Sequence, residues 1–190
     1  MPNNFRIGDR LKESSAVIGN LASQTELIER AAVALMEALR KGKKVVLFGN
    51  GGSAADAQHM AAEFVCAYAN QKRKSLPALA LTTDTSVLTA IGNDFGFEKI
   101  FSRQVESLVN DGDVVIALST SGMSANVIEG AKAARSKGAL VIGFAGETGG
   151  TLKAECDFCL CVSSKNTAYV QQAHITVGHI LCALVEEATA

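Results

Sequence analysis

Apolar and polar positions along this chain follow two different periods. Short apolar runs rich in β-branched residues recur over residues 44–49, 77–82, 113–119, 140–145 and 158–162. Continuous runs of this length are typical of strands that are buried on both faces. Between them, apolar residues repeat with a helical period over about residues 54–69, 86–91, 98–109 and 124–137. Strands that alternate with helices predict an α/β fold, with a five-stranded parallel sheet inside a three-layer α/β/α sandwich.

Helical patterns also flank this unit on both sides. We expect two N-terminal helices, over about residues 4–20 and 24–41, and a last helix over about residues 167–187. An apolar stripe on the second helix (Ala31, Ala32, Leu35, Met36 and Leu39) suits packing on the sheet or on a partner subunit. The chain of 190 residues shows no linker or repeat, so residues 1–190 are interpreted as one domain, with residues 1–42 as its N-terminal helices.

The first polar segment with chemical potential follows the first strand. Asn50, Gly51, Gly52 and Ser53 leave the strand and lead directly into a helical pattern. A glycine pair lets the backbone approach a ligand closely, and the N–H groups at the start of a helix favour anions. Either Ser53 or Asp56 can cap that helix. One turn further on, His59 and Glu63 stand at i and i+4, which places both on one face of the helix.

A second hydroxyl-rich loop follows the third strand. It contains Ser119, Thr120, Ser121, Gly122 and Ser124, and then enters another helix. Its hydroxyl and backbone N–H groups suit phosphate oxygens, although a helix cap and ordinary turn chemistry explain the same residues. The loop has neither the Gly-Lys-Ser/Thr of a Walker A motif nor a GxGxxG pattern, so it does not indicate nucleotide binding.

The last helix carries a third group of polar residues. Gln171 and His179 point within about a quadrant of each other at about 100° per residue, while His174 points elsewhere. His59, Glu63 and His179 would form a set of two histidines and one carboxylate that suits zinc or another divalent ion. The spacing does not show that the two helices meet, nor does it choose His179 over His174 or Gln171 over Gln172.

Two further segments combine turn chemistry with polar groups. Asp84 or Thr85 is expected to cap a short helix after the second strand. Residues 92–97 are interpreted as a glycine-bounded loop in which Asn93 and Asp94 either bind sugar hydroxyls or hold a turn.

Composition narrows the class of partner. A net charge of −1 gives no electrostatic case for nucleic acid, and no segment reaches the ~18 apolar residues of a membrane span. The start of the chain lacks the apolar core of a signal peptide, so we expect a cytoplasmic protein. The five cysteines, including the pair Cys156 and Cys159, are interpreted as packed free thiols rather than a zinc or redox site.

In their order and gaps, these motifs resemble the sugar isomerase (SIS) domain, and within it the phosphoheptose isomerases. The resemblance rests on residues 49–59 (GNGGSAADAQH), 80–86 (ALTTDTS), 90–96 (AIGNDFG), 101–105 (FSRQV) and 119–122 (STSG). It implies a flavodoxin-like or Rossmann-like fold and interconversion of sedoheptulose 7-phosphate and D-glycero-D-manno-heptose 7-phosphate. This reaction leads to the heptose of bacterial lipopolysaccharide or related surface polysaccharides. The resemblance also implies homotetramers with sites shared between subunits.

The resemblance further assigns roles to individual residues. It implies one zinc ion per subunit, held by residues matching His59, Glu63, Gln171 and His179. It implies substrate contacts at Asn50, Gly51, Gly52, Ser53, Glu63, Asn93, Asp94, Ser119, Thr120, Ser121, Ser124 and Gln171. The chain departs from the family pattern at Ala67 and Tyr169, where arginine is frequent, and at Gln172, where glutamate is frequent.

For an aldose–ketose isomerisation through an enediol, we expect Glu63 to act as the base and His179 as the partner acid. Two alternatives remain at this point: a non-catalytic SIS protein, such as a replication-initiator-associating factor, and an isomerase of another phosphosugar. The presence of all four metal-site residues favours the enzyme over the first alternative.

Overall fold

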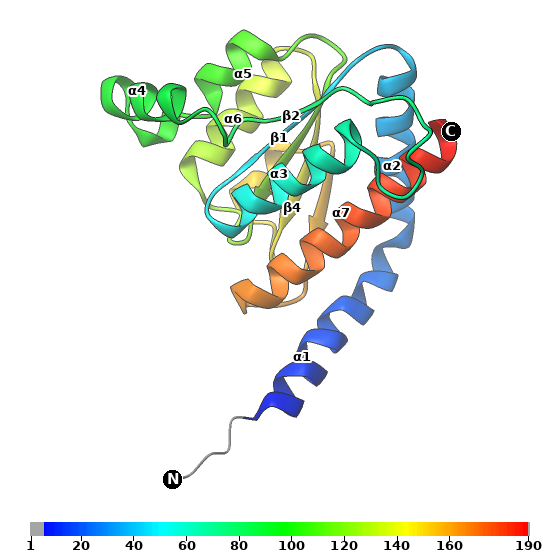
Figure 1. Cartoon of the computed structure of the whole chain (residues 1–190). Helices are drawn as coiled ribbons and strands as arrows, with labels where there is room; N and C mark the ends of the chain where they lie inside the picture. Colours follow the sequence, from blue (N-terminus) through cyan, green and yellow to red (C-terminus); the bar gives the residue numbers. More distant parts are fainter. Residues whose placement is uncertain (1–5, 190) are drawn as a thin grey trace.

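A computed structural model describes residues 6–189 and contains a five-stranded, all-parallel sheet (Figure 1). The strands are β1 (Val45–Gly49), β2 (Ala78–Ala80), β3 (Val114–Ser119), β4 (Leu140–Ala145) and β5 (Phe158–Cys161). Their order across the sheet is β2-β1-β3-β4-β5. The chain thus leaves β1 toward one edge of the sheet and returns to build β3 on the other side of β1. The predicted parallel sheet is confirmed.

Helices cover both faces of the sheet, as predicted for a three-layer sandwich. On one face α2 (Thr25–Arg40), α3 (Gly52–Val65) and α7 (Thr167–Thr189) pack against side chains such as Leu47 and Ile116. On the other face α5 (Ser102–Leu108) and α6 (Ala125–Ser136) pack against Phe48 and Val115. Successive strand residues therefore feed two separate cores, which explains why the strands are apolar without alternation. Within residues 6–189, no helix is long and apolar enough to cross a membrane.

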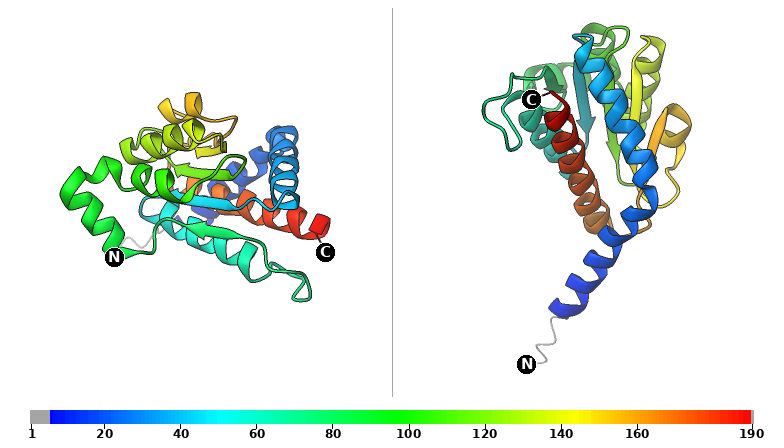
Figure 2. Two further views of the ribbon diagram at one scale, coloured as in Figure 1. Left: turned by 90° about the horizontal axis from the view of Figure 1, so that it is seen from above. Right: turned by 90° about the vertical axis from the view of Figure 1, so that its right-hand side faces the viewer.

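The N-terminal helix α1 (Ile7–Gly19) projects from this body (Figures 1 and 2). The 3-10 turn η1 (Asn20–Gln24) joins it to α2. No residue of α1 is buried, and its polar contacts run to the start of α7, where the hydroxyl of Tyr169 donates to Glu13 at 3.1 Å. Of the predicted N-terminal helices, α2 packs on the sheet while α1 leaves Ile7 and Leu11 exposed. The predicted start of the first helix, residues 4 and 5, lies outside the described residues.

Some predicted boundaries are wrong. The helix predicted to run to residue 69 ends at Val65, and the backbone N–H groups of Tyr68 and Ala69 bond to the distant carboxylate of Glu186 instead of continuing the helix. The segment predicted as a loop around Asn93 and Asp94 is the end of α4 (Thr85–Phe95). Gly96, at φ +92°, terminates this helix. The predicted helix 98–109 begins only at Ser102, after the short turn η2 (Phe97–Lys99).

The helix caps follow the sequence in one case and not in another. The Asp84 carboxylate accepts from the N–H of Val87 at 3.0 Å, so the predicted cap of α4 is confirmed. The predicted cap of α3 is wrong: α3 begins at Gly52, its N-cap is Gly51, and no side chain caps it. Gly51 adopts φ +55°, a conformation open to glycine at little cost. Ser53 is buried inside the first turn instead.

The five cysteines are free, but Cys66 is exposed, so the predicted packing applies only to the other four. Cys182 is buried between α7 and α3, and burial raises the pKa of its thiol to about 12. The sulfurs of Cys159 and Cys161 lie 3.9 Å apart, and hydrogen bonding with Cys156 raises the pKa of Cys159 to about 12. The thiols of Cys159 and Cys182 are therefore neutral packing groups at physiological pH. Cys159 follows the turn η3 (Thr151–Glu155), and Cys182 lies on α7.

His174 is fully buried where α7 crosses the sheet. Its Nε2 lies 3.2 Å from the carbonyl oxygen of Ala145, and its ring packs beside Phe144. Burial lowers the pKa of His174 from 6.5 to about 4, so the folded protein holds the neutral ring. The unfolded chain takes up that proton near pH 6.5, and folding therefore weakens as the pH falls from about 6.5 to about 4.

We expect a His174→Gln variant to lose this pH dependence. Over that window the wild-type free energy of unfolding should fall by about 3 kcal/mol more than that of the variant, at ~1.4 kcal/mol for each unit of pKa difference. Urea unfolding at pH 7.0, 6.0, 5.0 and 4.5 measures the difference. Parallel pH profiles for the two proteins would contradict the assignment of His174 as a buried neutral histidine.

Candidate active site and metal centre

Three side chains that could hold a metal converge between α3 and α7. Nε2 of His59 lies 3.1 Å from Oε1 of Glu63 and 3.2 Å from Nε2 of His179. His59 and Glu63 come from successive turns of α3, and His179 comes from α7, 116 or more residues later in the chain. The helices approach closely because residue 178 is glycine: a β-carbon there would lie 2.8 Å from the sulfur of Met60. The structure therefore shows that α3 and α7 pack together, which the residue spacing alone could not predict.

The donor set fits a divalent cation. One ligand atom from each of His59, Glu63 and His179 lies within 4.8 Å of the others, and no other such group occurs among residues 6–189. For zinc bonds of about 2.0–2.1 Å, the edge of a ligand tetrahedron is about 3.3 Å, close to the two separations seen here. Two facing imidazole nitrogens and a carboxylate oxygen are the ligand types that suit zinc and its neighbours. His59, Glu63 and His179 are therefore a candidate metal centre.

Gln171, the fourth predicted ligand, lies on the same helix as His179, and its role as a ligand stays a prediction. Eight residues separate it from His179, which corresponds to about 12 Å along the helix. Its amide packs against the start of α3, where a β-carbon at Gly52 would lie 2.4 Å from Nε2 of Gln171. Gly52 is thus required for this close approach. Asn93 and Asp94 lie on the exposed end of α4, where the two side chains bond to each other.

The two predicted strand-end loops lie side by side at the point where the order of the strands reverses. β1 and β3 are neighbours in the sheet, and open α/β sheets bind ligands in the crevice at such a switch point. Asn50 after β1 and Asn126 in α6 exchange two amide hydrogen bonds, each 2.8 Å long. Asn126 was not among the predicted site residues, because its role depends on a partner 76 positions away.

The hydroxyl-rich loop is internally ordered. The hydroxyl of Ser119 donates to that of Ser124 at 3.0 Å, and the N–H of Met123 donates to the hydroxyl of Ser121 at 3.1 Å. Ser124 occupies the N-cap position of α6 but makes no side-chain cap bond, so its hydroxyl belongs to this loop. A pocket of about 260 Å³ adjoins Thr120 and Ser121 and has further polar groups on its walls, from Ser164, Lys165 and Thr167. Hydroxyl and backbone N–H groups suit a phosphate group, and the ammonium of Lys165 lies 3.9 Å from the carboxylate of Glu147 on the same wall.

Gly122 fixes the shape of this loop, and a Gly122→Ala substitution should change ligand binding. Gly122 has φ +66°, and a β-carbon there would lie 2.1 Å from the carbonyl oxygen of Gly149, so the backbone must shift. We expect a KM for a phosphorylated substrate raised at least tenfold, with metal content unchanged because the candidate metal centre lies on α3 and α7. Steady-state kinetics with elemental analysis test this. A KM within twofold of wild type would show that the loop does not bind substrate.

A buried carboxylate between the two regions has no assigned partner. Oδ2 of Asp56 is buried without a hydrogen bond from the described residues. Desolvation raises the pKa of Asp56, and nearby His59 partly offsets this effect. Asp56 was one of the two predicted caps of α3, but it lies within the helix, one turn before His59.

Comparison with known proteins identifies the family. The family model of the SIS domain matches residues 11–146. A phosphoheptose isomerase of Roseiflexus sp. is 54% identical over 166 residues, which span 87% of this chain and 84% of the relative. The chain belongs to the phosphoheptose isomerase family of SIS-domain proteins. This confirms the family that the sequence motifs resemble.

Solved structures agree with this membership in the phosphoheptose isomerase family. The phosphoheptose isomerase of Neisseria gonorrhoeae is 41% identical and superposes with a TM-score of 0.90, covering 96% of this chain and 97% of that one. The phosphoheptose isomerase of Francisella tularensis is 33% identical, with a TM-score of 0.93 over 98% of this chain and 100% of that one. The fold is therefore shared along nearly the whole length of the family's members.

Proposed function

We propose that this chain is a metal-dependent phosphoheptose isomerase that converts sedoheptulose 7-phosphate to D-glycero-D-manno-heptose 7-phosphate in the cytoplasm. The observation that carries the proposal is the convergence of His59, Glu63 and His179, two of them on the helix that begins directly after the β1 loop. Relatives that share about half of its residues carry the name phosphoheptose isomerase. A zinc ion, one per subunit, is the ion that the three donors suit best. Five free thiols favour a reducing compartment.

The reaction requires removal of a proton from a carbon beside a carbonyl. In the proposal Glu63 takes this proton, and His179 moves a proton between the two sugar oxygens as the enediol forms and collapses. Oε1 of Glu63 faces His59, which leaves Oε2 as the proton acceptor. The bound ion would supply electrostatic stabilisation to the sugar oxygens. Glu63 lies on α3 and His179 lies on α7, which packs against α3. The positions of both side chains are therefore fixed before the substrate binds.

The remaining site residues would bind the substrate away from the reacting carbons. The phosphate is placed on Ser119, Thr120, Ser121 and Ser124, and sugar hydroxyls on Asn50, Gly51, Gly52 and Ser53. Binding energy from a distant phosphate can then position the carbons that react. This use of the loop is supported by its ordered hydroxyls and by the adjoining pocket.

The proposal includes a homo-oligomer, a tetramer. Asn93 and Asp94 lie on the exposed end of α4, and the proposal places them in the site of a neighbouring subunit. Exposed apolar side chains on the projecting helices α1 and α4, including Ile7, Leu11 and Phe95, would be covered in such an assembly. Mass measurement in solution, before and after a Leu11→Glu substitution, tests this. A monomeric wild-type protein with full activity would overturn it.

Ala67 and Tyr169 stand where arginine is frequent in the family, so the choice of substrate is tested by experiment. Ala67 carries no charge, and the hydroxyl of Tyr169 is bonded to Glu13. Purified protein loaded with zinc should convert sedoheptulose 7-phosphate to the aldose, followed by NMR, and should leave five- and six-carbon ketose phosphates unchanged. Turnover of one of those in place of the heptulose would identify an isomerase of another phosphosugar. No turnover of any ketose phosphate, with zinc bound, would favour a non-catalytic binding protein.

A further inference from the structure

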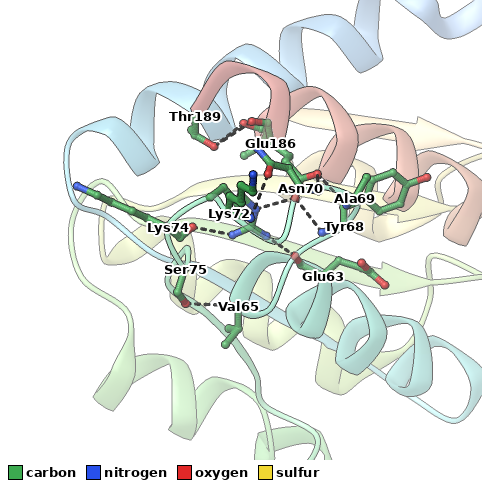
Figure 3. A network of polar contacts seen from close by, with 12 residues as sticks. Glu63, Val65, Tyr68, Ala69, Asn70, Lys72, Lys74, Ser75, Glu186 and Thr189 are labelled. Atoms are coloured by element: carbon green, nitrogen blue, oxygen red, sulfur yellow. Dashed lines mark hydrogen bonds and ion pairs between the residues drawn. The ribbon is translucent and has the colours of Figure 1, made fainter.

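The segment between α3 and β2 has neither helix nor strand, yet one carboxylate orders it. Glu186, near the end of α7, accepts three consecutive backbone N–H groups: from Tyr68 at 2.9 Å and from Ala69 and Asn70 at 2.7 Å each. Figure 3 shows this carboxylate facing the backbone of the segment, more than 110 residues away in the chain. Three donors on one carboxylate give a strong and directional anchor.

Arg73 completes the anchor and connects it to the metal centre. Its Nε donates to Glu186 at 2.8 Å, one terminal nitrogen donates to the carbonyl oxygen of Glu63 at 2.5 Å, and the other donates to the carbonyl oxygen of Lys74. The side chains of Arg73 and Glu186 are 1% and 6% exposed. In Figure 3 the carboxylate of Glu63 points away from its own carbonyl and thus from this network. The guanidinium therefore holds the last turn of α3, and with it the base of the proposed reaction.

The charge of Glu186 is permanent at physiological pH. Burial alone would raise the pKa of its carboxyl, but the N–H groups of Asn70, Ala69 and Tyr68 and the guanidinium of Arg73 lower it to about 2. The anchor is thus a fixed structural element rather than a switch.

Tyr68 is the residue that this anchor brings to the metal centre. Its ring lies beside that of His179, with centroids 5.7 Å apart and planes at 45°. The side chain is still 42% exposed, and its hydroxyl has no hydrogen-bond partner among residues 6–189. A packing residue would bury its ring, whereas this ring stays exposed beside one of the three candidate metal ligands. Sequence reasoning missed Tyr68 because residues 66–69 continue the helical pattern.

We propose that Tyr68 forms a wall of the sugar site over the metal centre, with its hydroxyl bonded to the bound sugar, and that Glu186 and Arg73 are the positioning residues that hold it there. This inference rests on the proposed function for the identity of the sugar. The position of Tyr68 over the metal centre can be tested without turnover.

Tyrosine fluorescence provides that test, because the chain has two tyrosines and no tryptophan. In a Tyr169→Phe background Tyr68 is the sole emitter. One equivalent of Cu²⁺, which quenches a ring at this distance and binds histidine sites tightly, should remove most of the emission. Adding Glu186→Gln should reduce the quenched fraction at least twofold, with the copper content of the protein unchanged. The matched control is Glu187→Gln, which removes the neighbouring exposed carboxylate and should leave quenching intact.

Kinetics test the contact with the sugar. Tyr68→Phe should raise the KM for the phosphosugar about 3- to 10-fold, the value of one hydrogen bond, while kcat changes less than twofold and metal affinity stays constant. Glu186→Gln should raise KM by a similar factor, and Glu187→Gln should not. If Glu186→Gln does not fold, Arg73→Lys replaces it, since lysine keeps the charge but cannot reach all three acceptors.

The outcomes separate this inference from the proposed function. Strong quenching of Tyr68 that depends on Glu186, in a protein that does not isomerise the heptulose, would support the position of Tyr68 beside the metal centre. It would refute the heptulose as the substrate. Normal isomerisation with a KM unchanged in Tyr68→Phe, or quenching unaffected by Glu186→Gln and Arg73→Lys, would overturn the inference and leave the function standing.

Discussion

A Glu63→Gln enzyme should lose turnover by about 10²–10⁴-fold, the usual contribution of a positioned acid–base group. Glutamine keeps the size of the side chain and one oxygen that can face His59, but it cannot accept the proton from carbon. The loss should therefore appear in kcat rather than in KM, because substrate binding depends on the loops after β1 and β3. Steady-state kinetics with sedoheptulose 7-phosphate, at saturating zinc, measure the effect.

Metal content must be measured on the same samples, since Glu63 is both a candidate ligand and the proposed base. Glu106→Gln, an exposed carboxylate on α5, is the control and should keep wild-type kcat. A near-wild-type kcat in Glu63→Gln with a full complement of metal would eliminate Glu63 as the base. A low kcat that returns to normal when zinc is raised would assign Glu63 to metal binding alone.

The fold could be read from the sequence because two independent periods agreed along the chain. Continuous apolar runs such as Val45–Gly49 belong to strands covered on both faces, and the structure has helices on both faces of the sheet. The i, i+4 spacing of His59 and Glu63 on a helix was equally secure, because it depends only on local geometry. Pattern reasoning succeeded where the deciding interactions lie within one element.

The errors arose where a distant residue decides local structure. The pattern of α3 continues past Val65, but the N–H groups of Tyr68, Ala69 and Asn70 bond to the Glu186 carboxylate instead of to the helix. The choice between His174 and His179 was open for the same reason. Both lie on α7, and only the packed structure shows His174 buried against β4 and His179 beside His59. Asn126 and Tyr68 stayed unassigned because their partners are far away in sequence.

Removal of one partner of the Arg73–Glu186 pair should lower the free energy of unfolding at pH 7 more than the other polar substitutions proposed above. Glu186→Ala leaves a covered guanidinium and three backbone N–H groups without an acceptor. Breaking a fully buried pair costs about 3–5 kcal/mol; this pair lies near the molecular surface, at the end of α7, where solvent screens it, so we expect about 2–3 kcal/mol. Urea unfolding at pH 7 measures this free energy, with Glu187→Ala as the matched control.

The pH dependence of that loss identifies its cause. The pKa of Glu186 is lowered to about 2 in the folded protein from an ordinary value of 4.5, so its stabilising effect is complete above about pH 4.5 and is lost as the pH falls through about 2. The difference between wild type and Glu186→Ala should therefore shrink as the pH falls from 5 toward 2. His174 titrates equally in both proteins and cancels from the comparison. A difference that stays constant down to pH 2.5 would mean that packing of the side chain, rather than the carboxylate charge, holds the segment from Tyr68 to Asn70 in place.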